Sequence, residues 1–254
     1  YDVGSYYKGE HLNDIWGLTT IGIAKSQEEM DAHLAKVDQS SVGTNWGVGD
    51  IMYADLDGDG KISNGTNKLG DTGDYRIIGN STPRFKYGIT LDAAWKGFDF
   101  SIFMQGIGKR DLWLDGCYFW GANGQGNEWQ STGFAEHWDF FRPEGDPLGA
   151  NLNSYYPRVN FSGDRNTKVQ TRYLQNGAYL RLKNVQLGYT LPRVWTEKAG
   201  ISSVRVYVSG DNLATITSLS KIFDPEATGS LAGTGSGKLY PLQRVISVGV
   251  NVNF

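Results

Sequence analysis

The chain has 254 residues, 39% of them apolar, which is enough for one or two domains with a hydrophobic core. Its formal net charge is −3, so the broad basic surface that binds nucleic acid or anionic lipid is excluded. The 34 glycines and the aromatic content of 13% favour an all-β architecture over a helical one.

No stretch of the sequence approaches about 18 consecutive apolar residues, so a transmembrane helix is not expected. A strand of a membrane barrel needs only about 10 residues with every second one apolar, a pattern that averaged hydropathy hides. The first residues, Tyr1-Asp2-Val3, carry neither an initiator Met nor the features of a signal peptide. We therefore expect a mature product or a piece of a longer protein. Because Cys117 is the single cysteine, an intrachain disulfide is excluded.

The first element expected along the chain is an amphipathic helix near residues 26–36. Its start is indicated by the capping box Ser26-Gln27-Glu28-Glu29, in which Ser and Glu side chains accept hydrogen bonds from backbone N–H groups.

The sharpest chemical motif follows, with carboxylates at alternate positions of Asp55-Leu56-Asp57-Gly58-Asp59-Gly60-Lys61-Ile62. When a chain turns sharply at a glycine, carboxylates at this spacing converge on one centre, as in an EF-hand loop. The carbonyl of Lys61 is then the natural backbone ligand. We therefore predict a Ca²⁺ site formed by Asp55, Asp57, Asp59 and Lys61.

The twelfth position of such a loop should hold a bidentate Glu, but here it holds Thr66. Asp71, Asp74 or a water molecule would have to take its place. No helix is expected before the loop, so an EF-hand pair is excluded. The alternative is an Asp/Gly turn in a solvated loop without a metal ion.

The clearest alternation of apolar and polar residues runs from Arg84 to Trp95. Its apolar side consists of Phe85, Tyr87, Ile89, Leu91, Ala93 and Trp95. This pattern predicts a long strand with one apolar and one polar face. A tight turn is predicted at Lys96–Gly97, followed by a second strand that begins at Phe98.

The remaining strands alternate with long irregular regions and short connections. Extended segments are predicted at 178–191, around 204–209 and at 242–254. In the first of them the apolar phase slips, which indicates a β-bulge near Lys183–Asn184. Residues 192–203 form a shorter connection, in which Trp195–Ala199 is expected to make a helical turn.

Two long loops are expected, at 109–177 and at 214–241. The first contains four tryptophans, Trp113, Trp120, Trp129 and Trp138. These rings are suited to stacking on sugars, or to packing inside the loops and at a membrane interface. The second interpretation is preferred because no feature of the sequence distinguishes one ring from another.

Two architectures are compatible with the alternating strands. In a soluble sandwich the apolar faces form the core and strands are usually about 5–6 residues long. In a membrane barrel the strands are longer, the lumen is polar and the outside is apolar. The predicted strand lengths and the charged polar faces favour the barrel. A secreted or surface glycan-binding sandwich with a structural calcium site is the alternative.

Several blocks of the sequence resemble SusC/RagA-type TonB-dependent transporters. In chain order they are Gly79-Asn80-Ser81-Thr82-Pro83-Arg84, Trp95-Lys96-Gly97-Phe98-Asp99-Phe100, Tyr179-Leu180-Arg181-Leu182-Lys183-Asn184, Tyr207-Val208-Ser209-Gly210-Asp211-Asn212-Leu213, Phe223-Asp224-Pro225-Glu226 and Tyr240-Pro241. The opening segment, with Val3-Gly4, resembles the family more weakly. The last residues, Ser247-x-Gly249-x-x-Val252-x-Phe254, are similar to a carboxy-terminal signal for barrel assembly.

The resemblance implies the carboxy-terminal part of an antiparallel transmembrane β-barrel of about 22 strands. Residues 1–254 are then one structural unit of that barrel, without its amino-terminal plug. The family implies uptake of oligosaccharides or peptides across the cell outer membrane. It also implies a SusD-like lipoprotein, TonB, the rest of the barrel and outer-membrane lipid as partners.

Because successive strands run in opposite directions, the side of the membrane assigned to one connection fixes the side of all the others. If Lys96–Gly97 is a periplasmic turn, residues 109–177 and 214–241 are extracellular and 192–203 is periplasmic. The final strand then ends at the periplasmic rim with Phe254.

No catalytic site is predicted. The sequence lacks the G-x-S-x-G and H-E-x-x-H motifs, and no family signature of a nucleophile surrounds Cys117. His11, His33 and His137 are too far apart in the sequence for a zinc-binding spacing. Pairs of carboxylates such as Asp92 and Asp99 occur by chance in a chain with 27 acidic residues.

Overall fold

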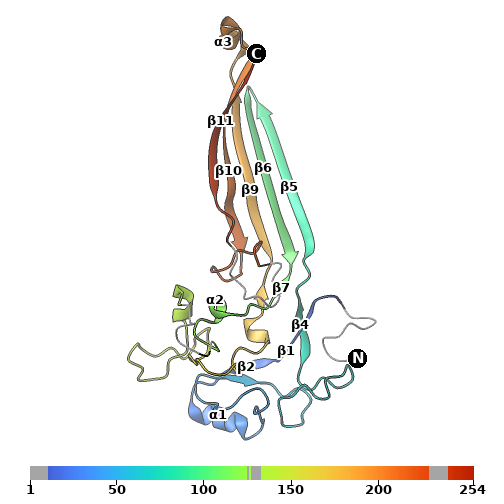
Figure 1. Ribbon diagram of the computed structural model, residues 1–254, viewed down its shortest axis with the longest axis vertical. Coiled ribbons are helices and arrows are strands. Elements are labelled where there is room, and N and C mark those ends of the chain that lie inside the picture. Colours follow the sequence, from blue (N-terminus) through green and yellow to red (C-terminus); the bar gives the residue numbers. More distant parts are fainter. Residues whose placement is uncertain (1–10, 125, 127–132, 229–239) are drawn as a thin grey trace. The chain divides into compact units, whose positions relative to one another are not determined.

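The computed structural model describes residues 11–124, 126, 133–228 and 240–254, which form two compact units (Figure 1). Unit 1 consists of Tyr1–Thr82, Asp111–Gln175 and Ser230–Leu239. Unit 2 consists of Pro83–Arg110, Asn176–Gly229 and Tyr240–Phe254. That residues 1–254 act as one structural unit of a larger barrel, as the resemblance implies, stays a prediction. The opening segment with Val3-Gly4 lies outside the described residues, as does Trp129.

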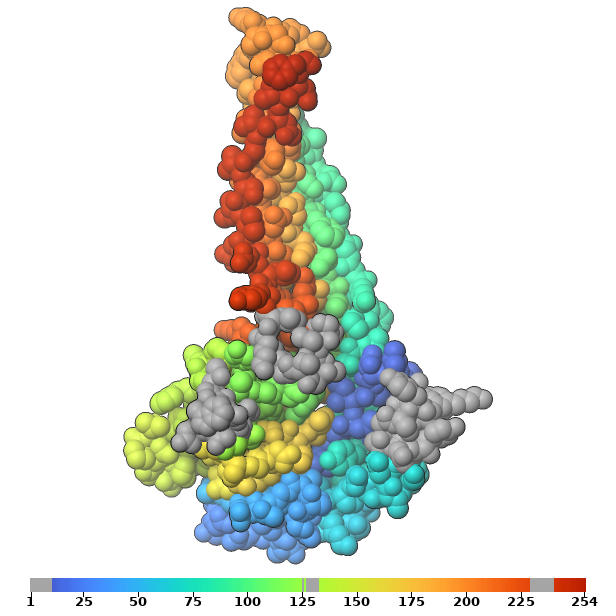
Figure 2. Space-filling model, viewed as in Figure 1, coloured from blue at the N-terminus to red at the C-terminus, as the bar shows by residue number. Residues whose placement is uncertain are grey.

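Unit 2 is built on one antiparallel sheet with the strand order β11-β10-β9-β6-β5 (Figure 1). Its strands are β5 (Arg84–Trp95), β6 (Phe98–Lys109), β9 (Tyr179–Thr190), β10 (Ser203–Thr217) and β11 (Val245–Asn253). Figure 2 shows the two edge strands, β5 in teal and β11 in red, at opposite sides of the sheet. The all-β antiparallel architecture predicted from the sequence is confirmed.

The hairpin between β5 and β6 closes through the predicted tight turn. Lys96 and Gly97 both have positive φ angles, of 47° and 89°. A two-residue turn with this geometry matches the right-handed twist of the strands, and a glycine at its second position relieves the steric strain. Trp95 and Phe98 therefore face each other as the first pair of the hairpin.

The predicted β-bulge lies in β9. Phe103 of β6 pairs with Asn184, whereas the next residue, Met104, pairs with Leu182. Lys183 is consequently skipped in the ladder with β6. One extra residue changes which face the following side chains occupy, and this explains the phase slip in the sequence.

The connection from β9 to β10 contains the predicted helical turn. It consists of α3 (Arg193–Thr196) and η4 (Glu197–Ala199) and ends at Gly200, whose φ of 72° caps the turn in the left-handed region.

Unit 1 has short regular elements joined by long loops. Strand β1 (Asp14–Gly17) pairs with β4 (Arg76–Asn80), and β2 (Thr20–Ile23) pairs with β3 (Ile51–Tyr53). The other elements are α1 (Gln27–Leu34), β7 (Asp111–Leu112), α2 (Cys117–Trp120), η2 (Ala135–Trp138), η3 (Thr171–Tyr173) and β8 (Gln175–Asn176). The largest fully buried apolar side chains are Leu18, Met30, Ile51, Tyr53, Ile62, Leu114, Phe119 and Tyr173.

Helix α1 is capped as the sequence predicted. The Ser26 side chain accepts a hydrogen bond from the Glu29 N–H at 3.2 Å. The Glu29 carboxylate in turn accepts from the Lys25 N–H at 2.6 Å, one residue earlier than in a standard capping box. Met30, on the inner side of the helix, is fully buried.

A buried ion-pair network connects distant loops of unit 1. Asp50 is completely buried, and its carboxylate accepts from Arg158 Nη2 at 2.6 Å and from Arg165 Nε at 3.2 Å. Asn166 Nδ2 donates to the other carboxylate oxygen at 2.8 Å. A charge can remain buried when it is paired in this way, so the network holds the loop around residue 50 against residues 158–166.

Among the described residues, none of the helices is long and apolar enough to cross a membrane.

Candidate functional site

The sheet of unit 2 has one apolar and one polar face, and its register makes the separation continuous across all five strands. One row of directly paired residues consists of Ala93, Phe100, Leu187, Val208 and Val248. The next row on the same face consists of Trp95, Phe98, Tyr189, Val206 and Val250. On the opposite face, next to the first of these rows, lies a row in which only polar residues occur, Asp92, Ser101, Gln186, Ser209 and Ser247.

The apolar face is exposed. The exposed fraction is 76% for Phe85 and Val248 and 69% for Trp95. Soluble monomers rarely expose continuous apolar patches of more than a few hundred Å². The sandwich alternative requires a second sheet packed on this face, and the described residues of unit 2 form only the one five-stranded sheet. A face of this kind needs an apolar environment.

The polar face carries a clamp, which we define as Arg181, Lys183, Asp224 and Glu226. Arg181 Nη2 lies 2.8 Å from Asp224 Oδ1, and both side chains are less than a tenth exposed. Lys183 Nζ lies 3.1 Å from Glu226 Oε2. Gln105 Nε2 also donates to Glu226, at 3.2 Å. The clamp therefore ties the segment after β10 to the polar face of β6 and β9.

Both edges of the sheet lack a second partner within the described residues. Strand β5 pairs with β6, and β11 pairs with β10. Such an edge presents unpaired backbone N–H and C=O groups, which in an apolar environment must be paired with further strands.

The aspartate loop of unit 1 brings three carboxylates together, though not the three predicted. Ligand oxygens of Asp55, Asp57 and Asp74 all lie within 4.8 Å of one another. No other group of three or more potential metal-binding side chains of this kind occurs among the described residues. The sequence named Asp71 and Asp74 as substitutes for the missing Glu, and the structure places Asp74 in the cluster.

The turn that forms the cluster depends on two glycines. Gly58 and Gly60 have φ angles of 80° and 79°. Their N–H groups donate to the two carboxylate oxygens of Asp55, at 2.7 Å and 2.9 Å. The Gly60 N–H is the main reason that the pKa of Asp55 lies below its usual value.

Asp74 is the buried member of the cluster. It is completely buried, and its two carboxylate oxygens accept from the N–H groups of Leu56 at 2.6 Å and Ser63 at 2.8 Å. Asp71 instead accepts from the Thr66 N–H at 3.0 Å and stands outside the cluster.

Of the other predicted ligands, Asp57 belongs to the cluster and Asp59 does not. Asp59 is exposed, and its carboxylate accepts from the Lys61 N–H at 2.8 Å. Asp57 accepts a hydrogen bond from the Asp59 N–H, which lowers the pKa of Asp57. Partial desolvation and the nearby carboxylates of Asp59, Asp74 and Asp55 raise the same pKa by a larger amount. The net result is a raised pKa for Asp57. Crowded carboxylates of this kind are the environment in which a cation is most stabilising.

The structure also distinguishes the loop tryptophans. Trp120 is 3% exposed and packs against Trp113 and Tyr173, with ring centroids 5.9 and 4.7 Å apart. Trp138 is 58% exposed. Trp120 is covered in part by Tyr173, which lies far along the chain, a contact that the local sequence does not reveal.

The three histidines occupy separate places. His33 Nε2 lies 3.0 Å from the Gln39 side chain, and His137 Nε2 lies 3.1 Å from the carbonyl oxygens of Tyr118 and Phe119. His11 stands 3.9 Å from Asp14.

Comparison with known proteins gives relatives in both sequence and fold, although no protein-family model matches the chain. The chain is 33% identical over 216 residues to TonB-dependent receptor P3 of Formosa agariphila, a match that covers 81% of this chain and 19% of that protein. It is 30% identical over 256 residues to TonB-dependent receptor P26 of the same organism, covering 97% of this chain and 23% of that protein. The chain thus spans about a fifth of the length of the curated relatives it matches.

Among solved structures, the chain is similar to the RagAB peptide importer in its open-open state, with a TM-score of 0.63 and 22% identity. The match covers 95% of this chain and 22% of that one. A structure of the RagAB peptide transporter gives a TM-score of 0.63 at 24% identity, with 95% and 23% of the two chains covered. At these identities the likeness concerns the fold.

Proposed function

The chain is a relative of the TonB-dependent receptors of the SusC/RagA type, and on that premise we propose that it forms part of the wall of an outer-membrane barrel that takes up oligosaccharides or peptides. Since its relatives are receptors, the chain is not an enzyme. The remainder of the barrel, a plug, TonB as the energy source and a SusD-like lipoprotein complete the proposed transporter.

The observation that carries this proposal is the register of the sheet. Apolar rows cross all five strands on one face, and a fully polar row crosses them on the other. The strands are 9 to 15 residues long, which meets the about 9–11 residues that a tilted strand needs to cross a bilayer. The apolar rows would face lipid and the polar rows would face the lumen.

Two neighbouring residues of β10 provide a matched test. Val208 and Ser209 lie at the same depth but on opposite faces of the sheet. In the full-length receptor, Val208→Arg should place a charge in lipid, where arginine costs about 2–4 kcal/mol near the bilayer centre. Ser209→Arg should place the same charge in the lumen, where it is tolerated.

The measurement is the amount of folded receptor in isolated outer membranes, judged by its resistance to unfolding in detergent at room temperature. We expect a strong loss for Val208→Arg and near-normal amounts for Ser209→Arg. Equal amounts for the two variants, or the reverse order, would contradict the proposed wall.

We propose in addition that the aspartate loop holds Ca²⁺, with Asp55, Asp57 and Asp74 as carboxylate ligands. The close approach of these three oxygens supports the proposal. Asp59 and the carbonyl of Lys61 would bring the ligand groups to five, and bidentate carboxylates or water would supply the rest of the six to eight oxygen ligands that Ca²⁺ prefers. The ion would hold together the loop of residues 55–61 and the segment that follows it.

A further inference from the structure

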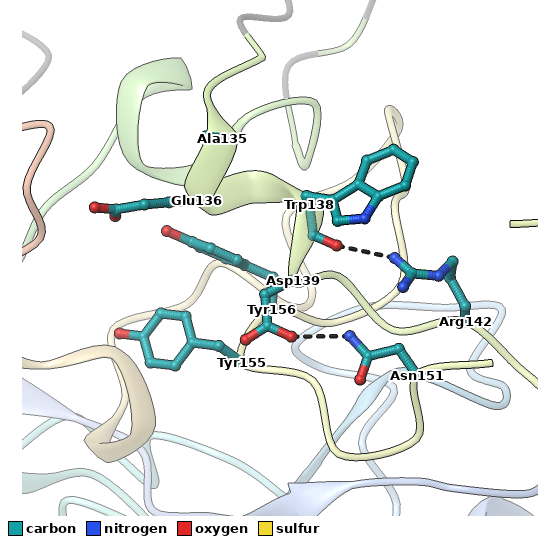
Figure 3. A pocket seen from close by; sticks show the side chains of 8 residues that line it. All are labelled: Ala135, Glu136, Trp138, Asp139, Arg142, Asn151, Tyr155 and Tyr156. Atoms are coloured by element: carbon teal, nitrogen blue, oxygen red, sulfur yellow. Dashed lines mark hydrogen bonds between the residues drawn. The ribbon is translucent and has the colours of Figure 1, made fainter. Parts of the chain in front are cut away.

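A cavity of about 440 Å³ opens among the loops of unit 1 (Figure 3). Its wall is formed by η2 and by two segments, 139–142 and 151–156, that are joined through backbone bridges. This volume lies within the range of about 300–1,000 Å³ that is usual for small-ligand sites.

An exposed indole forms one side of the cavity. Trp138 is 58% exposed, and the Arg142 guanidinium lies over its ring, 5.3 Å from the centroid (Figure 3). Arg142 is itself fixed, because it donates to the carbonyls of Gly149 at 2.7 Å and Trp138 at 2.9 Å. The ring is therefore held in place before any ligand arrives, which reduces the entropy lost on binding.

Polar side chains stand beside this ring. Asn151 Nδ2 donates to Asp139 Oδ1 at 2.8 Å, so the amide and the carboxylate hold each other in position (Figure 3). The Tyr155 hydroxyl accepts from Gln175 Nε2 at 2.8 Å, which leaves its O–H as a donor. A flat apolar surface beside fixed carboxylate, amide and phenol groups matches a sugar ring, which has an apolar C–H face and a rim of hydroxyls.

We propose that this cavity binds a segment of a neutral oligosaccharide, with one sugar ring on Trp138 and its hydroxyls on Asp139, Asn151 and Tyr155. This inference rests on the proposed uptake function and narrows its substrate class.

A peptide fits the cavity less well because the bordering main chain is already paired. Arg142 and Asn151 exchange N–H to C=O bonds at 3.2 and 2.9 Å, and the Tyr156 N–H donates to Asp139 O at 2.9 Å. These paired backbone groups are therefore not available to an extended peptide that would add by backbone hydrogen bonds.

An anionic glycan is also disfavoured. The carboxylates of Glu136 and Asp139 both line the cavity. The cation among the lining residues is Arg142, and two carbonyl groups already engage its guanidinium. A sulfated or uronate sugar would face like charge from these carboxylates, and among the described lining residues Arg142 alone carries the opposite charge.

Calorimetric titration of the full-length receptor in detergent tests the proposal. The probes are neutral oligosaccharides of gluco, galacto, manno and xylo type, uronate oligosaccharides of matched length, and short peptides. The variants are Trp138→Ala and Asn151→Ala, with Trp195→Ala as the control. Trp195 is 66% exposed, in the turn between β9 and β10, and takes no part in the cavity.

We expect at least one neutral oligosaccharide to bind, and Trp138→Ala to weaken its binding about tenfold, the effect of losing one well-placed aromatic contact. Asn151→Ala should weaken binding in the same direction, while Trp195→Ala should leave it unchanged. The proposal is overturned if no neutral oligosaccharide binds, if Trp138→Ala binds as well as the parent, or if peptides or uronates are the ligands that depend on Trp138.

Isolation of outer membranes from cells that express the same variants distinguishes a failure of the proposed sugar site from a failure of the proposed uptake function. A receptor that reaches the outer membrane but shows no dependence on Trp138 refutes the sugar site alone. A receptor that never enters the outer membrane refutes the proposed wall.

Discussion

At the scale of single residues, the sequence identified the aspartate loop but not its complete membership. Alternating carboxylates and the glycines at 58 and 60 predict a tight turn, and the turn is present. Asp74 joins the cluster because the chain folds back there, where its N–H donates to Ser63 O at 2.9 Å. Such a return depends on packing of unit 1, so spacing alone left Asp71 and Asp74 as equal alternatives.

The proposed calcium site should weaken as the solution becomes acidic. The pKa of Asp57 is raised, so this carboxylate takes up a proton at a higher pH than an ordinary aspartate does, and the proton competes with Ca²⁺. The pKa of Asp55 lies below its usual value, so Asp55 stays ionised to lower pH. Affinity should therefore fall first through the titration of Asp57 as pH decreases.

Calorimetric titration of the full-length receptor with Ca²⁺ checks this. The double variant Asp55→Asn/Asp57→Asn should bind at least about tenfold more weakly, since affinity follows the number of charged ligands. Asp71→Asn is the control, because it removes a charge from the segment that follows the loop, outside the cluster. If the parent does not bind Ca²⁺, or if Asp71→Asn is equally damaging, the site is refuted.

At the scale of elements, the strands were predictable because the two faces of each strand lie in different environments, one apolar and one polar. The expected strand at 84–95 and the bulge near Lys183 agree with the structure. The ends of the strands were less predictable. Strand β10 continues to Thr217, and β11 begins at Val245 instead of residue 242. Near that point the Leu242 N–H donates to Asp224 at 3.0 Å, a contact with the preceding loop that no alternation reveals.

The clamp should act as one cooperative group. Asp224→Ala removes the acceptor for both Arg181 and the Leu242 N–H, and it leaves a buried guanidinium without its closest partner. Loss of one member of a buried pair costs about 3–5 kcal/mol. We expect faster proteolysis within residues 219–228 and a lower unfolding temperature of the full-length receptor.

The control for the clamp is the exposed pair Arg193–Glu197, whose side chains are 77% and 56% exposed. Glu197→Ala should change stability by less than about 1 kcal/mol. Adding Arg181→Ala to Asp224→Ala should cost less than the sum of the single variants. Strict additivity would show that the two residues do not act together.

At the scale of the whole molecule, the apolar and polar faces follow from sequence alternation, but closure of a barrel does not. Among the described residues both edges of the five-stranded sheet lack a further strand, and the chain supplies about a fifth of the length of its relatives. The division into two units was also hidden, because residues 111–175 fold with the amino-terminal part instead of with the strands that flank them.

The parity of the strands predicts the orientation of the loops. In intact cells, a cysteine introduced at Gly124 should react with a reagent that does not cross membranes, and one at Gly97 should not. Gly97 lies in the hairpin turn that we assign to the periplasm, whereas Gly124 belongs to the loop region 109–177. The second extracellular region, 214–241, includes Gly235, which lies outside the described residues. Labelling at Gly97 without labelling at Gly124 would show that the proposed orientation is reversed.

One face of the sheet is proposed to contact lipid and the other to contact water, and spin labels along β10 measure this directly. Nitroxides are attached one at a time at residues 206, 207, 208 and 209 of the full-length receptor in lipid vesicles, and their collisions with oxygen and with a water-soluble nickel complex are compared. Positions 206 and 208 belong to the apolar rows, so oxygen should dominate there, while nickel should dominate at 207 and 209. The same accessibility at all four positions, or the opposite alternation, would contradict the account.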